Sequence, residues 1–418
     1  MYKQSKKDNL MTFIKRLLAL SIVLPCFSVM MSGLVQATTF VPYVKQSGFN
    51  FTPGLYSSVA SDGNTVVIGN NNLNNSTGVA YVYVNNSGNW SLQAVLHPNG
   101  LTAGSDFGTN VMISGNNIAV SSPLHAIYLY QRNGYQWNLV ATITPPTAQD
   151  AQFDNTWGWG GKGTVALMNN TLLVEGSSII YQYTLSGNVW SMDIPAMSTF
   201  LYQGGWGSNP VKFALDSNGV LVVAGQNVSK PEVDAYVYVQ EGNTFPTADL
   251  AQPYLVLNTY NTYHPFWYPT FQITVNANAI AYYQGDAQLS YVGVITRGSI
   301  LGAQWGSVNV IQLPQFQPNV ADAVFLANNL VFIDAETYNQ YSNANTPVAT
   351  YVYQRGTTLN SWVLDQKINN LEASAVTQSQ LLIGGYSGPG NYMQDYSQAK
   401  VVAFPIVQAT SKLSQAGN

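Results

Sequence analysis

Apolar and polar residues alternate in short runs along most of the chain, and a pair of tyrosines marks the same place in five of these runs. The pairs are Tyr81/Tyr83, Tyr128/Tyr130, Tyr181/Tyr183, Tyr236/Tyr238 and Tyr351/Tyr353. An aromatic residue follows the first four pairs seven residues later and the fifth pair nine residues later, at Trp90, Trp137, Trp190, Phe245 and Trp362. Alternation with a period of two is typical of strands, so the pattern predicts an all-β chain built from a repeated unit.

Short turns separate the strand-like runs at regular intervals. They fall at Asp62-Gly63, Gly115-Asn116, Asn169-Asn170, Asn218-Gly219, Asn276-Ala277, Asn328-Asn329 and Gln378-Ser379. Gly and Asn suit tight hairpin turns because they accept a positive φ more readily than other residues. Each unit divides into four short strands, and a period of about 50 residues with four strands is typical of a β-propeller. We therefore expect a seven-bladed β-propeller of four-stranded blades.

The last unit has one strand too few, which suggests how the repeat closes. Its strand-like runs are Ala373–Thr377, Leu381–Gly384 and Lys400–Ile406, and a polar tail follows at residues 408–418. The segment Phe40–Lys45 has strand character and precedes the first unit, so we expect it to complete the last blade. Pro42 is compatible with an outermost strand, where one edge needs no amide donor. Residues 38–407 are thus expected to form a single propeller domain.

The tyrosine pairs themselves call for a structural interpretation. Alternation places both tyrosines on one face of a middle strand, where they would pack between blades with their hydroxyls near polar groups. They predict no function.

Residues 1–37 are typical of a secretory signal peptide: basic residues precede the apolar run Leu17–Val35, which ends in the small-residue site Val35-Gln36-Ala37. An uncleaved membrane anchor and a lipoprotein modified at Cys26 are the alternatives, the second disfavoured by Leu24-Pro25. Cleavage would remove the only cysteine, so no disulfide is expected. We expect an exported protein, whether secreted, periplasmic or on the cell surface, without a membrane span after cleavage.

The net charge of the chain argues against two classes of binding partner. The leader holds five Lys or Arg residues and one acid, which leaves ten basic and eighteen acidic residues and a formal charge of −8 beyond it, against −4 for the whole chain. Nucleic acids and anionic lipids need clustered positive charge, so neither is an expected partner.

The first two units resemble the FG-GAP repeats of integrin α-type propellers. The resemblance rests on Asp106-Phe107-Gly108, on Val111–Gly115 and on Ile118–Pro123, where Ser121-Ser122-Pro123 stands in place of Gly-Ala-Pro. It implies a seven-bladed propeller used as an extracellular binding surface, often with calcium in acidic turns. The turns here are too short and too poor in carboxylates for calcium, which takes six or more oxygens, so no metal or other cofactor is expected.

Loops on the propeller face opposite the tight turns are expected to be long, at Asn70–Gly78, Gly225–Val233, Leu250–Thr270, Asp334–Pro347 and Gly385–Ser397. Binding residues are often carried by such loops on a rigid scaffold. Several aromatic residues in these connections and nearby ones are candidate ligand-binding residues, since they can stack on a sugar or anchor a protein contact: Trp157, Trp159, Trp206, Tyr263, His264 and Trp267. Structural packing is the alternative for Trp159, Tyr263 and Trp267 as well as for Trp157 and Trp206. It is favoured for the last two, because each precedes a glycine as Phe107 precedes Gly108.

Catalysis finds little support in the sequence. His97, His125 and His264 fall in different units without metal spacing, and no nucleophile elbow or phosphate loop is present. No catalytic residue is therefore assigned. We expect a non-catalytic binding module for an extracellular protein or a glycan, the second making it a lectin. A propeller glycosidase or lyase with carboxylates around the axis is a further alternative, because residues from separate blades would leave no local motif.

Overall fold

The structure is a computed structural model, and β-strands account for most of the residues that it describes. The residues it describes are 58–87, 89–123, 125–147, 165–176, 179–193, 197–198, 212–216, 219–226, 233–239, 270–276, 279–285, 290–296, 309–311, 319–327, 329–339, 344–356, 361–369, 371–376, 380–385 and 400–405. All of them belong to one compact unit, residues 42–407. The expected leader (1–37), closing strand (Phe40–Lys45) and tail (408–418) lie outside the described residues.

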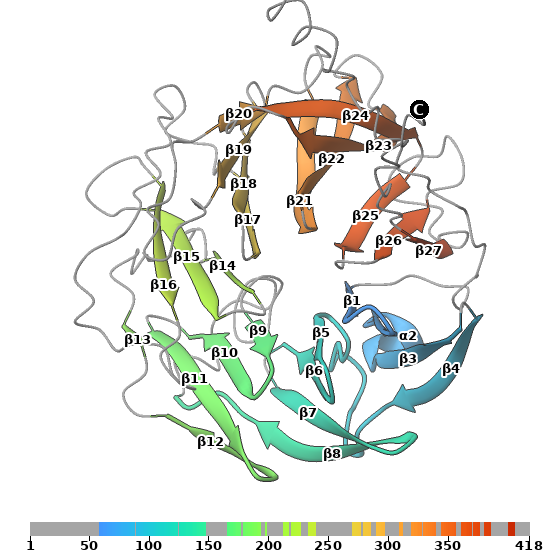
Figure 1. The fold of residues 1–418 in the computed structure, drawn as a ribbon. Helices are drawn as coiled ribbons and strands as arrows, with labels where there is room; N and C mark the ends of the chain where they lie inside the picture. Colours follow the sequence, from blue (N-terminus) through green and yellow to red (C-terminus); the bar gives the residue numbers. More distant parts are fainter. Residues whose placement is uncertain are drawn as a thin grey trace, which may run out of the picture. The chain divides into compact units, whose positions relative to one another are not determined.

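Three antiparallel sheets form first along the chain, and each keeps its strands in chain order (Figure 1). The first contains β1 (Ser58–Ser61), β2 (Thr65–Asn70), β3 (Val79–Asn86) and β4 (Asn89–Leu96), with the single turn α2 (Leu73–Ser76) between β2 and β3. The second contains β5 (Val111–Ser114), β6 (Asn117–Ser122), β7 (Ala126–Asn133) and β8 (Gln136–Ile143). The third contains β9 (Val165–Met168), β10 (Thr171–Glu175), β11 (Ile179–Ser186), β12 (Val189–Met192) and the short β13 (Met197–Ser198), which pairs with β11.

Four further antiparallel sheets follow. The fourth has β14 (Lys212–Leu215), β15 (Val220–Gln226) and β16 (Val233–Val239). The fifth has β17 (Thr270–Asn276), β18 (Ala279–Gly285), β19 (Ser290–Thr296) and β20 (Asn309–Ile311). The sixth has β21 (Asn319–Ala327), β22 (Leu330–Asn339), β23 (Ala344–Arg355) and β24 (Trp362–Asn369). The seventh has β25 (Leu371–Val376), β26 (Gln380–Gly385) and β27 (Lys400–Pro405).

The all-β class predicted from the sequence is confirmed. The first, second, fifth and sixth sheets each have four strands, and among the described strands no sheet closes on itself by hydrogen bonds. In this described part of the chain, no helix has the length and apolar character needed to cross a membrane.

Tight turns join the first two strands of the first three sheets at the predicted places. Gly115-Asn116 lies between the paired residues Ser114 and Asn117, and Asn169-Asn170 follows the last residue of β9. The first residue of each of these turns has a positive φ, +57° at Gly115 and +49° at Asn169, which is the backbone requirement that selects Gly and Asn.

The prediction of one long loop is wrong. Asp334–Pro347 was expected to be a long connection, but β22 and β23 stay paired as far as Asn339 and Ala344. A register shift between Ala335 and Thr337 lets the hairpin continue past the body of the sheet. Thr337 and Tyr338 are good strand formers, which favours the extension over a loop.

The first strands of successive sheets pack against one another. β1 contacts β5, β5 contacts β9, β9 contacts β14, β14 contacts β17, β17 contacts β21, and β21 contacts β25. β25 also contacts β1, so the succession of contacts returns to the sheet where it began.

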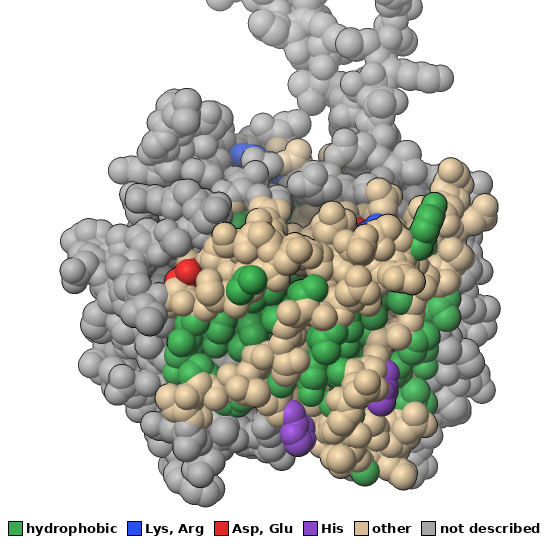
Figure 2. Space-filling model, turned by 90° about the horizontal axis from the view of Figure 1, so that it is seen from below, with side chains coloured by type: hydrophobic (Ala, Val, Ile, Leu, Met, Phe, Trp, Pro, Cys, Tyr) green, Lys and Arg blue, Asp and Glu red, His purple; other side chains and the backbone are tan. Residues whose placement is uncertain are grey.

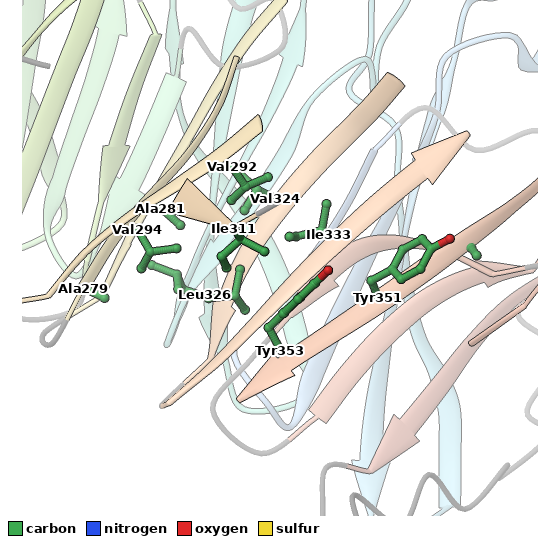
Figure 3. Close-up of a cluster of buried hydrophobic side chains, with 12 residues drawn as sticks. Ala279, Ala281, Val292, Val294, Ile311, Val324, Leu326, Ile333, Tyr351 and Tyr353 are labelled. Atoms are coloured by element: carbon green, nitrogen blue, oxygen red, sulfur yellow. The ribbon is translucent and has the colours of Figure 1, made fainter. Parts of the chain in front are cut away.

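Apolar cores fill the spaces between neighbouring sheets. Figure 3 shows the core between the fifth and sixth sheets, where side chains from both sides meet in one layer; its members include Val292, Val294, Ile311, Val324, Leu326, Ile333, Tyr351 and Tyr353. Burial, with a smaller effect of Tyr351, raises the pKa of Tyr353 to about 12, so its hydroxyl stays protonated at pH values where an exposed tyrosine would ionise.

The tyrosine pairs of the second, third and sixth sheets take part in these cores, as predicted. The expectation that the hydroxyls lie near polar groups is wrong at Tyr130, whose hydroxyl is buried without a hydrogen-bond partner. Tyr130 of β7 packs with Val67 and Val82 of the first sheet, and Tyr181 and Tyr183 of β11 pack with residues of the second. Each of these pairs therefore faces the preceding sheet.

Cross-strand register keeps the aromatic residue after each pair in one place. The paired positions are Asn85 with Trp90, Arg132 with Trp137, Leu185 with Trp190 and Arg355 with Trp362. In all four sheets, the Trp lies opposite the residue two positions after the second tyrosine. The two extra residues before Trp362 are therefore held in the turn, where the Gly356 amide donates to the Ser361 carbonyl at 2.7 Å.

Candidate binding surface

The six aromatic residues that the sequence nominates, Trp157, Trp159, Trp206, Tyr263, His264 and Trp267, all lie outside the described residues. Two connections of the expected loop face are described in the first two sheets. They are the β2–β3 connection, residues 71–78, and the β4–β5 connection, residues 97–110. Together with the β6–β7 corner at residues 122–125, we call them the loop cluster.

The β2–β3 connection contains three consecutive non-glycine residues in the left-handed region. Asn74, Asn75 and Ser76 have φ values of +54°, +57° and +59°. This conformation costs an L-residue roughly 1–2 kcal/mol, and Asn tolerates it better than most because its short amide can bond locally. Such a run persists only where surrounding contacts hold it, and strained backbone of this kind is often found at functional sites.

Hydrogen bonds from the β4–β5 connection hold this turn in place. The amides of Gly104, Asp106 and Phe107 donate to the carbonyls of Asn75, Ser76 and Thr77 at 3.1, 2.7 and 3.2 Å. A parallel bridge between Gly78 and Phe107 extends the pairing. The strained turn is thus tied to the chain that enters the second sheet.

Glycines allow the two connections to approach each other at backbone distance. A Cβ on Gly78 would lie 2.0 Å from the Phe107 carbonyl oxygen, and one on Gly69 would lie 2.0 Å from that of Gly108. A Cβ on Gly108 would lie 2.6 Å from the Val79 carbonyl oxygen. These contacts leave no space for any side chain, so the loop cluster has a rigid base.

Phe107 anchors that base. Its ring is fully buried and meets Tyr128 edge-on, with centroids 5.4 Å apart and planes at 70°. This geometry is favourable for aromatic pairs. The Phe-Gly step noted in the sequence therefore serves to fasten the first two sheets together.

The β6–β7 corner is fixed by serine hydroxyls. Ser121 Oγ accepts from the Asn110 amide at 3.0 Å, and Ser122 Oγ donates to the Ser105 carbonyl. Both serines are buried. The Ser121-Ser122-Pro123 segment thereby locks the corner against the β4–β5 connection.

Exposed polar groups line the outside of the loop cluster. Asn72, Asn74 and Asn75 are exposed, and Asn72 makes no side-chain capping bond. Asp106 is the acidic member. Partial burial raises the pKa of its carboxyl, opposed by a hydrogen bond from Ser76 and by the positive charge that His125 can carry.

This arrangement can offer hydrogen bonds to a ligand from a surface rich in hydroxyls and amides, with Asp106 as its acidic group. Among the described residues, no three His, Cys, Asp or Glu side chains gather as a metal site would require. The sequence predicted a long loop here but missed the left-handed turn. The run of asparagines at positions 70–75, interrupted only by Leu73, was the available signal.

Comparisons with known proteins give no family. No family model matches the chain, and no curated protein matches it. Among solved structures, the chain is similar to Sqt1 of Saccharomyces cerevisiae, with 12% identity, a TM-score of 0.46, and 85% of this chain and 86% of that chain covered. It is also similar to the computationally designed Ika8 protein, with 11% identity, a TM-score of 0.43, and 88% and 100% covered. These scores are too low to support a conclusion about family or function.

Proposed function

We propose that the chain is a seven-bladed β-propeller whose sheets are the blades. Two observations support this: the seven sheets follow one another along the chain, and contacts between their first strands return from β25 to β1. We further propose that Phe40–Lys45 pairs with β27, because that strand has only β26 as a partner among the described strands. Such a closing strand would join the two ends of the repeat and protect an open sheet edge.

We propose that this propeller is an exported, non-catalytic binding module that presents the loops of one face to an extracellular partner. The observation that carries the proposal is the left-handed turn Asn74–Ser76, held over a base of backbone contacts while its amide side chains stay exposed. Strain retained in an exposed polar turn is better explained by presentation of groups to a ligand than by packing.

A glycan is the partner that the chemistry favours. Exposed amides and hydroxyls with a single nearby carboxylate match a polyhydroxylated, uncharged ligand. In a propeller, Trp159, Tyr263 and Trp267 would fall in loops of the later blades, where their rings could stack on sugars. A protein partner, as the FG-GAP resemblance implies, is the second candidate.

Binding of the exported chain to a broad glycan array tests the proposal. Two variants separate the parts of the face: one with Trp159, Tyr263 and Trp267 changed to Ala, and one with Asn74→Gly and Asn75→Gly. Glycine keeps the positive φ and removes only the amides. Asn116→Gly, in a tight turn outside the loop cluster, is the matched control.

Loss of sugar binding in either loop variant, with binding kept in Asn116→Gly, would support a lectin. Absence of binding to any glycan, with specific capture of one extracellular protein that the same loop variants abolish, would replace the glycan with a protein partner. Equal loss in all three variants would contradict the assignment of the binding face.

A further inference from the structure

The β4–β5 connection carries an Asn-Gly dipeptide near its start. Asn99 and Gly100 lie in a turn outside the strands, and both residues are exposed. Gly100 has φ +90°, and a Cβ added to it would meet nothing within 4 Å. The dipeptide is therefore open to solvent and lacks the close backbone contacts that surround Gly78 and Gly108 in the same loop cluster.

An asparagine that precedes a glycine can react with its own backbone. The nitrogen of the glycine loses its proton and forms a bond to Cγ of the asparagine, and the side-chain amide leaves as ammonia. Water then opens the cyclic imide at either carbonyl, which gives aspartate or isoaspartate. The net change converts an amide and water into a carboxylic acid and ammonia. Glycine favours ring closure because it has no Cβ in the way and restricts its backbone least.

The other two Asn-Gly dipeptides of the chain, at 133–134 and 218–219, are more restrained. Asn133 is the last residue of β7 and pairs with Gln136 across the hairpin. Ring closure requires rotation about the Cα–C bond of the asparagine, so this end of the hairpin has to open first. In the third dipeptide, the reacting nitrogen belongs to Gly219, and its amide donates to the Asp216 carbonyl at 3.2 Å.

The Asp62-Gly63 turn shows how hydrogen bonds can restrain the same chemistry. An aspartate before a glycine can close the same ring with loss of water. Here the Gly63 amide donates to Ser61 Oγ at 3.1 Å, and Asp62 Oδ1 accepts from the amides of Asn64 and Thr65 at 3.2 and 2.9 Å. Both reacting groups of this turn are therefore engaged, in contrast to the open turn at Asn99.

The surroundings of Asn99 are poor in charge. His97 and His125, both in the loop cluster, are the histidines among the described residues. Figure 2 shows them along one border of the described surface, away from the acidic and basic side chains that are visible in that view. The three segments of the loop cluster contain no Lys or Arg, and Asp106 is their one acid. A new carboxylate at position 99 would therefore add a negative charge that no neighbouring Lys or Arg of the cluster balances.

We propose that Asn99 is a site of spontaneous deamidation, at which the folded chain is converted with time to aspartate and isoaspartate. Water is the only co-reactant. Each product adds one negative charge to the loop cluster, and isoaspartate also adds one backbone atom to the connection whose amides hold the Asn74–Ser76 turn. Ligand binding by the loop cluster should therefore weaken as the protein ages. That consequence rests on the proposed binding function, whereas the modification itself does not.

Peptide mapping by mass spectrometry, with enzymatic methylation to detect isoaspartate, tests the proposal on the exported chain incubated at neutral pH. Asn99 should be converted roughly tenfold faster than Asn133, because the hairpin has to open before Asn133 can react. In concentrated urea the two rates should become similar, since both asparagines then precede glycine in an unfolded chain. Asn99→Gln, which would have to form a larger ring, should resist conversion. Asn133→Gln is the matched control and should leave conversion at Asn99 unchanged.

Faster conversion at Asn99 than at Asn133 in the folded chain, with the difference lost in urea, would support the proposal. Equal rates in the folded chain, or an Asn99 that reacts only in urea, would overturn it. Glycan binding supplies a separate readout: it should decline during incubation of the wild type and stay constant in Asn99→Gln. A fresh chain that binds no glycan would contradict the proposed function, while the mass spectra would still decide whether Asn99 is modified.

Discussion

Replacement of Gly78 by alanine tests whether close backbone contact fastens the first two sheets. Gly78 has φ +84°, and an added Cβ would lie 2.0 Å from the Phe107 carbonyl oxygen and 2.7 Å from its carbonyl carbon and its nitrogen. All three neighbours are backbone atoms, so no side chain can rotate away. The two connections would have to move apart, and the hydrogen bonds that hold the Asn74–Ser76 turn would weaken.

Three terms set the expected loss of stability. A left-handed alanine costs roughly 1–2 kcal/mol, and overpacking typically costs about 1–3 kcal/mol. The reduced freedom of the unfolded chain returns about 0.4–1 kcal/mol. The free energy of unfolding should therefore fall by about 3 kcal/mol.

Gly104→Ala is the matched control. Gly104 belongs to the same loop cluster and has φ +80°, but an added Cβ would have nothing within 4 Å. Its loss should comprise the conformational terms alone, about 1 kcal/mol. Urea unfolding followed by tryptophan fluorescence measures both variants. Losses that agree within about 0.5 kcal/mol would refute the role given to backbone contact, because overpacking would then contribute nothing.

Three other changes have definite expected outcomes. Phe107→Ala should lower the free energy of unfolding by about 3–5 kcal/mol, because the ring is fully buried, and a loss under about 1 kcal/mol in urea unfolding would contradict its anchoring role. Asp365→Asn should raise the melting temperature at pH 7. Burial raises the pKa of the Asp365 carboxyl above its usual 3.8, and its Oδ2 has no hydrogen-bond partner. The ionised carboxylate therefore destabilises the native state. That penalty develops as the pH rises from the usual pKa of 3.8 to the raised pKa, and it is absent where folded and unfolded forms are both protonated. The gain should therefore shrink toward pH 4, and a gain independent of pH would exclude this cause. Deletion of Phe40–Lys45 should lower the melting temperature, and an unchanged value would remove the closing strand from the proposal.

Local patterns predicted the strands and tight turns well because each is decided within a few residues. Gly115-Asn116 and Asn169-Asn170 lie where the sequence placed them, since the backbone conformation of such turns restricts the residue type. The outer part of the β22–β23 hairpin was missed because most of its residues are polar, and the good strand formers Thr337 and Tyr338 become a strand only by pairing with Thr346 and Asn345.

The described surfaces depend on contacts that no local pattern records. The turn at Asn74–Ser76 is left-handed because Gly104 and Asp106 supply donors from the β4–β5 connection. Leu92 and Leu139 fit an ordinary strand pattern, and the register shifts that accompany them arise only when the two strands pair. The nominated aromatic loops remain predictions, because they lie outside the described residues.

The register shared by the four tryptophans has a consequence for how this chain can change in length. Trp362 follows its tyrosine pair two residues later than the other three tryptophans follow theirs, yet it pairs with Arg355 in the same register. The extra length falls between Gly356 and Ser361, which close the turn by a hydrogen bond. The equivalent turn at Gly134-Tyr135 is exposed and has no such addition. Insertions at such hairpin ends can therefore be accepted without a change in any strand, so the exposed turn at Gly134-Tyr135 is a natural position for an epitope or an affinity tag.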